Sequence, residues 1–171
     1  WREGHGNEEA LPGGDLELRN KQMIWSLKRF LHGQVEFRWA GIGARKIGNS
    51  KYMGFGDPNE GYAAGFRLYG DGGEGLELYA VVINHGQAKA KKIPWMEDYV
   101  GHARFIVSWF LDKIEFITMT PEFYNKVATF VEKDLPEVGL PKIHMEISIQ
   151  SASGTEPVYV PLVKYDSYSN H

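Results

Sequence analysis

An alternation of apolar and polar side chains near the C-terminus constrains the fold more than any other feature of the chain. It comprises, in order, Ile143, His144, Met145, Glu146, Ile147, Ser148, Ile149 and Gln150. Successive side chains of a β-strand point to opposite faces, so the run predicts a strand with one face on a core and the other in water. Half-buried strands of this kind are typical of antiparallel sheets. We expect a loop over 151–157 to end the strand, and an extended arm to follow from Val158.

The same period of two recurs along most of the chain. Strands are predicted over 33–39, 51–55, 65–69, 75–83, 102–109 and 110–118. The glycine-rich stretch 70–74 should join 65–69 to 75–83 as a β-hairpin, because glycine readily adopts the positive φ that tight turns need. The second strand of that hairpin becomes apolar on both faces toward its end, which predicts a central position in the sheet.

Two segments instead show the spacing of an amphipathic helix. Apolar residues recur at helical intervals over 20–31, namely Met23, Ile24, Leu27, Phe30 and Leu31. A second helix is predicted over 121–133, because Thr120 and Pro121 form a typical helix start. Both helices would pack against the predicted strands.

Short strands, two short helices and no βαβ alternation predict an all-β fold, an antiparallel β-sandwich or jelly roll. The 171 residues suffice for one domain with a core of its own. We expect this domain to span 16–165, between a flexible arm over 1–15 and a tail over 166–171. A start at Trp1 rather than Met indicates a processed product or a shortened chain.

Composition excludes several function classes. The formal net charge is -3, which gives no overall attraction to nucleic acid or to an anionic membrane. The chain has no cysteine, and so it has no disulfide, thiol nucleophile or thiolate metal site. No apolar run approaches the ~18 residues that a membrane span needs, so no span is expected.

Sequence patterns give no catalytic signature. The chain lacks the nucleophile pattern G-x-S-x-G and the zinc pattern H-E-x-x-H, and its histidines do not fall at metal-ligand spacing. We therefore predict no catalytic, cofactor-binding or metal-binding residue. Two arrangements stay open as lesser alternatives: a metal site formed by His102, His144 and Glu146, and a carboxylate pair drawn from Glu36, Glu77 and Glu146.

Two short stretches are candidate binding surfaces. Trp95 and Tyr99 lie near Pro94, which marks a strand entry or sheet edge, and their rings could contact a sugar or another subunit. Lys89, Lys91 and Lys92 form a local basic patch, for which a phosphate backbone would be a suitable partner. Solvated side chains are the simpler interpretation of the lysines.

Four stretches, taken in order, resemble the capsid jelly roll of picorna-like viruses. They are 27–39, where a basic and aromatic segment enters a strand; 51–58, a strand that ends in proline; 91–99, with its Ile-Pro-Trp; and 143–157, a strand that runs into a small-residue loop. The chain is shorter than that family and lacks its earliest strand. It also carries Ser153–Gly154–Thr155–Glu156 where Gly-Asp-Asp-aromatic is common.

The resemblance implies a structural role. The chain would be a capsid subunit of the virion that self-assembles into an icosahedral shell enclosing RNA. Its partners would be other copies of itself or sister capsid subunits, together with genomic RNA, and it would not be an enzyme.

Two other function classes stay open. One is a carbohydrate-binding, lectin-like β-sandwich that uses aromatic side chains near Trp95. The other is a β-sandwich hydrolase with a carboxylate or histidine site. Either would be a soluble protein of unspecified compartment.

Overall fold

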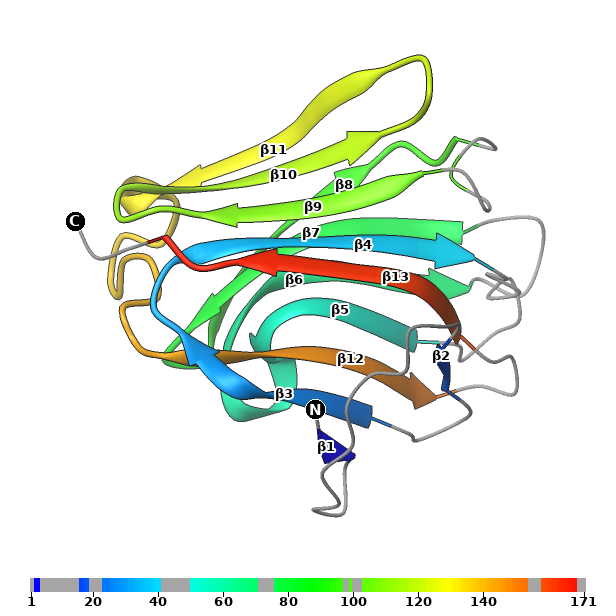
Figure 1. Ribbon diagram of the computed structural model, residues 1–171. Coiled ribbons are helices and arrows are strands. Elements are labelled where there is room, and N and C mark those ends of the chain that lie inside the picture. Colours follow the sequence, from blue (N-terminus) through cyan, green and yellow to red (C-terminus); the bar gives the residue numbers. More distant parts are fainter. Residues whose placement is uncertain are drawn as a thin grey trace.

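Two antiparallel sheets packed face to face form the protein (Figure 1). The computed structural model describes residues 2–3, 16–18, 23–40, 50–70, 76–96, 99, 103–153 and 158–168. Within these residues the chain is nearly all strand, which confirms the predicted antiparallel β-sandwich. Its longest described helical segments are two 3-10 turns, η1 (Pro58–Glu60) and η3 (Glu132–Asp134).

Strands of the described chain divide between a seven-stranded and a six-stranded sheet. The spatial order of the seven-stranded sheet is β1 (Arg2–Glu3), β3 (Met23–Phe30), β12 (Met145–Ser153), β5 (Ser50–Asp57), β6 (Tyr62–Gly70), β7 (Leu76–Asn84) and β8 (Gln87–Ile93). The spatial order of the six-stranded sheet is β11 (Tyr124–Val131), β10 (Lys113–Met119), β9 (Arg104–Trp109), β4 (Gly33–Ala40), β13 (Val158–Asp166) and β2 (Leu16–Leu18).

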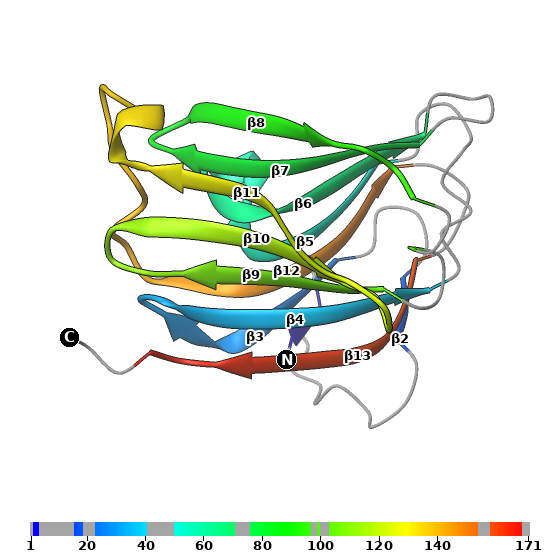
Figure 2. The same cartoon turned by 90° about the horizontal axis from the view of Figure 1, so that it is seen from above.

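The chain crosses between the two sheets several times. β3 and β4 lie in different sheets, β5 to β8 follow one another in the first sheet, and β9 to β11 follow one another in the second. β12 then returns to insert between β3 and β5, and β13 pairs with β4. Figure 2 shows that the strands of both sheets lie along roughly the same axis, which is the aligned packing of a β-sandwich.

Alternate side chains of the two sheets fill the space between them. Phe66 of β6 is fully buried, and its ring makes edge contacts with Phe105 of β9 and Phe116 of β10, each with centroids 5.3 Å apart. These contacts join the two layers. Leu68 and Leu78 lie opposite each other in the same core, so the predicted pairing of 65–69 with 75–83 is confirmed.

The strand predicted over 143–150 is confirmed as β12 from Met145 onward, but Ile143 lies before the strand and is exposed, and the loop expected over 151–157 is wrong for 151–153, which continue the strand. Ile147 is 0% exposed and lies opposite Phe55 of β5. The other face is not solvated as expected, since Ser148 and Gln150 are buried too. Their polar groups are satisfied because the Gln150 amide donates to the Ser148 hydroxyl, which donates to the carbonyl oxygen of Gly56. The arm expected after Val158 is a full strand, β13.

The helix predicted over 20–31 is wrong, because residues 23–30 form β3. The register of β3 with β12 shifts between the pair Arg29–Glu146 and the pair Trp25–Ser148, so β3 carries extra residues as a bulge. A bulge interrupts the period of two, and the apolar spacing then imitates a helix. Leu27, which was expected to face the core, is 52% exposed.

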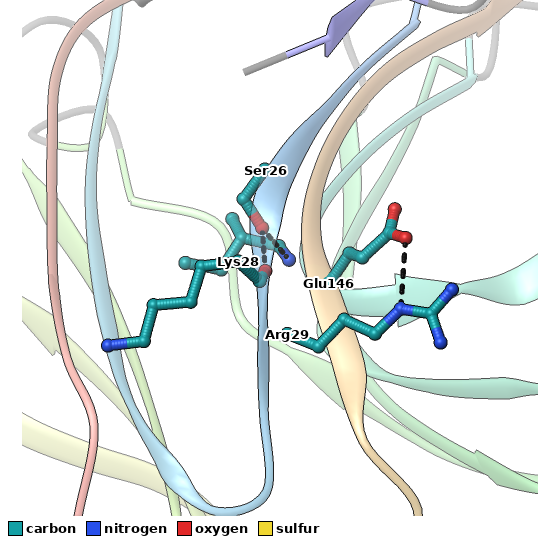
Figure 3. Close-up of polar contacts among 5 residues, drawn as sticks. Ser26, Lys28, Arg29 and Glu146 are labelled. Atoms are coloured by element: carbon teal, nitrogen blue, oxygen red, sulfur yellow. Dashed lines mark hydrogen bonds and ion pairs between the residues drawn. The ribbon is translucent and has the colours of Figure 1, made fainter.

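Side-chain hydrogen bonds replace the missing strand pairing at this bulge. The N–H of Ile147 donates to the Ser26 hydroxyl at 2.8 Å, and that hydroxyl donates to the carbonyl oxygen of Lys28 at 2.7 Å (Figure 3). The backbone of β12 therefore keeps a partner where β3 bends away.

The helix predicted over 121–133 is wrong as well, because residues 124–131 form β11 at the edge of the six-stranded sheet. Its register with β10 shifts between Phe116 and Ile117, so a bulge again disturbs the period of two. Thr120 does accept the N–H of Phe123 at 3.1 Å, but it caps a turn and not a helix. The side chain of Phe123 is exposed.

Candidate functional site

Three strands of the seven-stranded sheet carry aromatic and charged side chains on their outer face. We call this group the tyrosine face, and its members are Arg67 and Tyr69 of β6, Glu77 and Tyr79 of β7, and Lys92 of β8. The intervening Leu68 and Leu78 lie in the core between the sheets. Because side chains alternate along a strand, the members of the tyrosine face point away from that core.

Strand pairing places these side chains in two rows. Arg67, Tyr79 and Lys92 lie opposite one another on three neighbouring strands. Tyr69 and Glu77 lie opposite each other in the adjacent row of the same face. Directly opposite side chains on one face of a sheet are close enough to touch, so these rows form one continuous surface.

Glu77 connects two of the other members. One carboxylate oxygen accepts a hydrogen bond from the Tyr79 hydroxyl at 3.0 Å, and the other accepts one from the Lys92 ammonium at 3.3 Å. The hydrogen bond to Glu77 raises the pKa of the Tyr79 hydroxyl, which keeps it protonated as a donor. The carboxylate therefore fixes the phenol and the ammonium relative to each other.

Arg67 is held by an aromatic ring and not by a counter-ion. Its guanidinium lies over the Tyr69 ring, 5.2 Å from the centroid, and the Tyr69 ring makes an edge contact with Tyr79 at 5.9 Å. Arg67 forms no hydrogen bond or ion pair with the described residues, and its Nε atom is buried without a partner. The guanidinium is thus positioned with its terminal N–H donors free for a ligand.

A recess of about 390 Å³ lies at the end of β3, β5 and β12 in the same sheet. We call it the end pocket, and its polar and aromatic lining residues are Trp25, Arg29, Asp57, Glu60, Tyr62, His144 and Glu146. Small-molecule sites commonly have volumes of roughly 300–1,000 Å³. The end pocket is therefore large enough for a small ligand.

Local structure explains the arrangement of the charged groups in the end pocket. Arg29 of β3 lies opposite Glu146 of β12, and Arg29 Nε donates to Glu146 Oε1 at 3.4 Å (Figure 3). Asp57 ends β5 and caps η1, because its Oδ1 accepts the N–H of Asn59 at 2.8 Å. Glu60 ends the same 3-10 turn and is exposed.

The three lysines of the predicted basic patch lie on the edge strand β8 but do not share one side of it. Lys92 belongs to the tyrosine face and pairs with Glu77. Lys89 and Lys91 lie opposite Val82 and Ala80, which places them on the other side of the strand, and both are exposed. Binding of phosphate by this patch stays a prediction.

Trp95 and Tyr99, the predicted binding edge, contact each other with ring centroids 5.5 Å apart. Tyr99 is buried, with its hydroxyl 3.2 Å from the hydroxyl of Thr118. Trp95 is half-buried against the core, and its indole N–H has no partner among the described residues. The structure thus packs the pair on the core, and its role as a binding edge stays a prediction.

The carboxylates considered from the sequence do not converge. Glu77 lies on the tyrosine face and Glu146 in the end pocket, whereas Glu36 lies in the other sheet, 3.8 Å from Arg104. His144 and Glu146 both line the end pocket, but His102 lies outside the described residues. No group of three or more His, Asp or Glu side chains in the described part of the chain is placed to hold a metal ion.

Sequence reasoning missed Arg67, Tyr69 and Tyr79, although a signal for them was present. The two strands read Arg-Leu-Tyr over 67–69 and Glu-Leu-Tyr over 77–79. Once the leucines are assigned to the core, the alternation puts the flanking polar and aromatic residues together on the outer face. Trp25 of the end pocket was missed because 20–31 was taken as a helix. Asp57 was missed because 51–58 was considered only as a strand that ends in proline.

Comparisons with known proteins find the fold in carbohydrate-related structures. No family model and no curated protein matches the sequence. A Crh5 transglycosylase in complex with NAG matches with a TM-score of 0.67 at 11% identity, over 99% of this chain and 79% of the other. A glycoside hydrolase family protein from Mycobacterium thermorestibile matches with a TM-score of 0.64 at 11% identity, over 89% and 76%. CG-16, a homodimeric agglutinin from chicken liver, matches with a TM-score of 0.51 at 10% identity, over 89% and 99%.

These comparisons correct the capsid hypothesis. Solved structures that share the fold include a transglycosylase, a xylan beta-1,4-xylosidase and a legume lectin-like domain, which do not resemble a capsid subunit in their described roles, so assignment to a picorna-like capsid and to a virion is wrong. The expectation that the chain is not an enzyme came from that assignment, and the matches to a transglycosylase and to glycoside hydrolases contradict it too. Within the described residues, no helix is long and apolar enough to cross a membrane.

Proposed function

We propose that the chain is a carbohydrate-recognising β-sandwich and that the tyrosine face contacts the sugar. The observation that carries this proposal is Arg67, whose guanidinium is fixed over the Tyr69 ring with its terminal donors free. Sugar hydroxyls both donate and accept hydrogen bonds, so they suit a face that carries both the Arg67 guanidinium and the Glu77 carboxylate. Exposed parts of aromatic rings provide the apolar surface on which a sugar ring can pack.

The structural neighbours support carbohydrate over other ligands that arginine and tyrosine can bind. Their descriptions include a transglycosylase with bound NAG, a glycoside hydrolase and an agglutinin. Substitutions on the tyrosine face therefore test whether the chain binds carbohydrate there.

Replacing tyrosine-face residues should weaken glycan binding. We expect Arg67→Ala and Tyr79→Ala each to lower affinity by about tenfold or more, because buried arginine and tyrosine contacts dominate many interfaces. The measurement is calorimetric titration with the best ligand from a glycan panel. Tyr124→Ala is the matched control, since Tyr124 is exposed on β11 of the other sheet. Unchanged affinity in both tyrosine-face variants would overturn the assignment of this face.

A second candidate function, hydrolysis or transfer of a glycosidic bond, is favoured by the carboxylates of the end pocket. Asp57, Glu60 and Glu146 line one recess, and most glycoside hydrolases use a pair of carboxyl groups. If the pocket is catalytic, Glu60→Gln or Glu146→Gln should lower turnover by about a hundredfold or more.

Release of reducing ends, or a shift in oligosaccharide length, measures this activity. Glu122→Gln is the control, because Glu122 is exposed beside β11, outside the residues that line the pocket. If the wild-type chain leaves intact every glycan that it binds, this second candidate fails and the recognition proposal stands alone.

A further inference from the structure

Asp57 is a nearly buried carboxylate that faces the end pocket. The residue is 8% exposed, and Oδ1 accepts the N–H of Asn59 at 2.8 Å. No described residue gives Oδ2 a hydrogen bond or an ion pair, and Oδ2 is not sealed from solvent. One oxygen is therefore fixed by the backbone, while the other is available to a group that enters the pocket.

A carboxylate in this position is unfavourable without a nearby positive charge. Removing a charged group from water costs free energy unless a partner compensates the charge. The negative charge of Asp57 also acts on the buried Tyr52. Burial is the largest cause that raises the pKa of the Tyr52 phenol, and the charge of Asp57 is the second. A cation bound in the pocket would relieve this uncompensated charge.

The described lining of the end pocket is acidic overall. It holds the carboxylates of Asp57, Glu60 and Glu146, whereas Arg29 is its only arginine or lysine. Arg29 is already paired with Glu146 at 3.4 Å. Asp57 and Glu60 are thus left without a cationic partner within the described lining.

The wall of the pocket favours an organic cation over a metal ion. Trp25 lines the pocket with a half-buried indole, and an ammonium group is attracted to the face of such a ring. In the described chain, no three carboxylate or histidine groups are placed to hold a metal. A pocket lined by both an indole and a carboxylate oxygen without a partner suits a ligand that is apolar on one side and positively charged on the other.

We infer that the end pocket binds the free ammonium group of an amino sugar, so that the chain selects glycans with unacetylated amines. This inference rests on the proposed function only in taking the ligand to be a glycan. It uses a different part of the seven-stranded sheet from the tyrosine face, and so variants separate the two.

Three β-1,4-linked disaccharides that differ only at C2 test the inference: the diamine, the diacetylated form and cellobiose. Calorimetric titration at low salt should show the diamine bound about fivefold more tightly than the other two, which is the upper range for one exposed charge pair. Asp57→Asn keeps an oxygen that accepts the Asn59 N–H and removes only the charge. It should abolish the preference without lowering the melting temperature.

Two further variants make the result independent of the stability of Asp57→Asn. Glu60→Gln, at an exposed position in the same pocket, should reduce the preference. Asp112→Asn, at an exposed turn between β9 and β10, should retain it in full.

Equal affinity for the three disaccharides, or a full preference in Glu60→Gln and Asp57→Asn, would overturn the inference. If only the tyrosine-face variants change binding, the proposed function stands and the inference about the end pocket is wrong. If no disaccharide binds while longer neutral glycans do, the inference again fails and the proposed function stands. If no glycan binds at all, both are wrong.

Discussion

His32 illustrates how one buried side chain can make the fold sensitive to pH. It lies in the turn between β3 and β4 with a left-handed φ of 68°, and it is 9% exposed. Its ring makes an edge contact with Trp109 at 5.3 Å. Burial lowers the pKa of His32 from its ordinary value of 6.5, so the folded chain binds a proton less readily than the unfolded chain. Stability is then lost as the pH falls below 6.5 toward the lower pKa of the folded state.

The substitution His32→Asn should remove this part of the pH dependence. Asparagine tolerates the left-handed backbone conformation and does not titrate in this range. We expect the variant to lose less unfolding free energy than the wild type between about pH 7.5 and about pH 5. Urea denaturation at the two pH values measures the difference. The same loss in both proteins would mean that His32 does not cause it.

At the scale of elements, β12 determines whether the seven-stranded sheet forms, because it pairs with β3 on one edge and β5 on the other. Ile147→Asp would place an unpaired charge in the core and should cost more than about 3 kcal/mol. Glu146→Ala should cost less than about 1 kcal/mol, since its partner Arg29 is 68% exposed. Chemical denaturation compares the two. A stable Ile147→Asp variant would show that the inward register of β12 is wrong.

At the scale of the whole molecule, the alternation of apolar and polar residues predicted a β-sandwich, but it did not predict how the strands are arranged in the two sheets. The hairpin of β6 and β7 could be predicted because its pairing is local and its turn is rich in glycine. β3 and β11 were misassigned because bulges interrupt the period of two, and a bulge depends on the partner strand. The end pocket needs Arg29 and Glu146 together, which are 117 positions apart. The capsid resemblance failed because short alternating strands with proline and glycine turns recur in many β-sandwiches, whatever their function.

The insertion of β12 between β3 and β5 also affects how the protein is made. A ribosome releases β3 and β5 long before it completes β12, and so neither strand can acquire this neighbour during most of synthesis. β4 likewise cannot pair with β13, the last described strand, until that strand has been synthesised. Contacts between residues far apart in sequence slow folding, because a long loop must close before they can form. Completion of both sheets is therefore a late event that follows translation of the C-terminal quarter of the chain, and the early strands expose open edges until then.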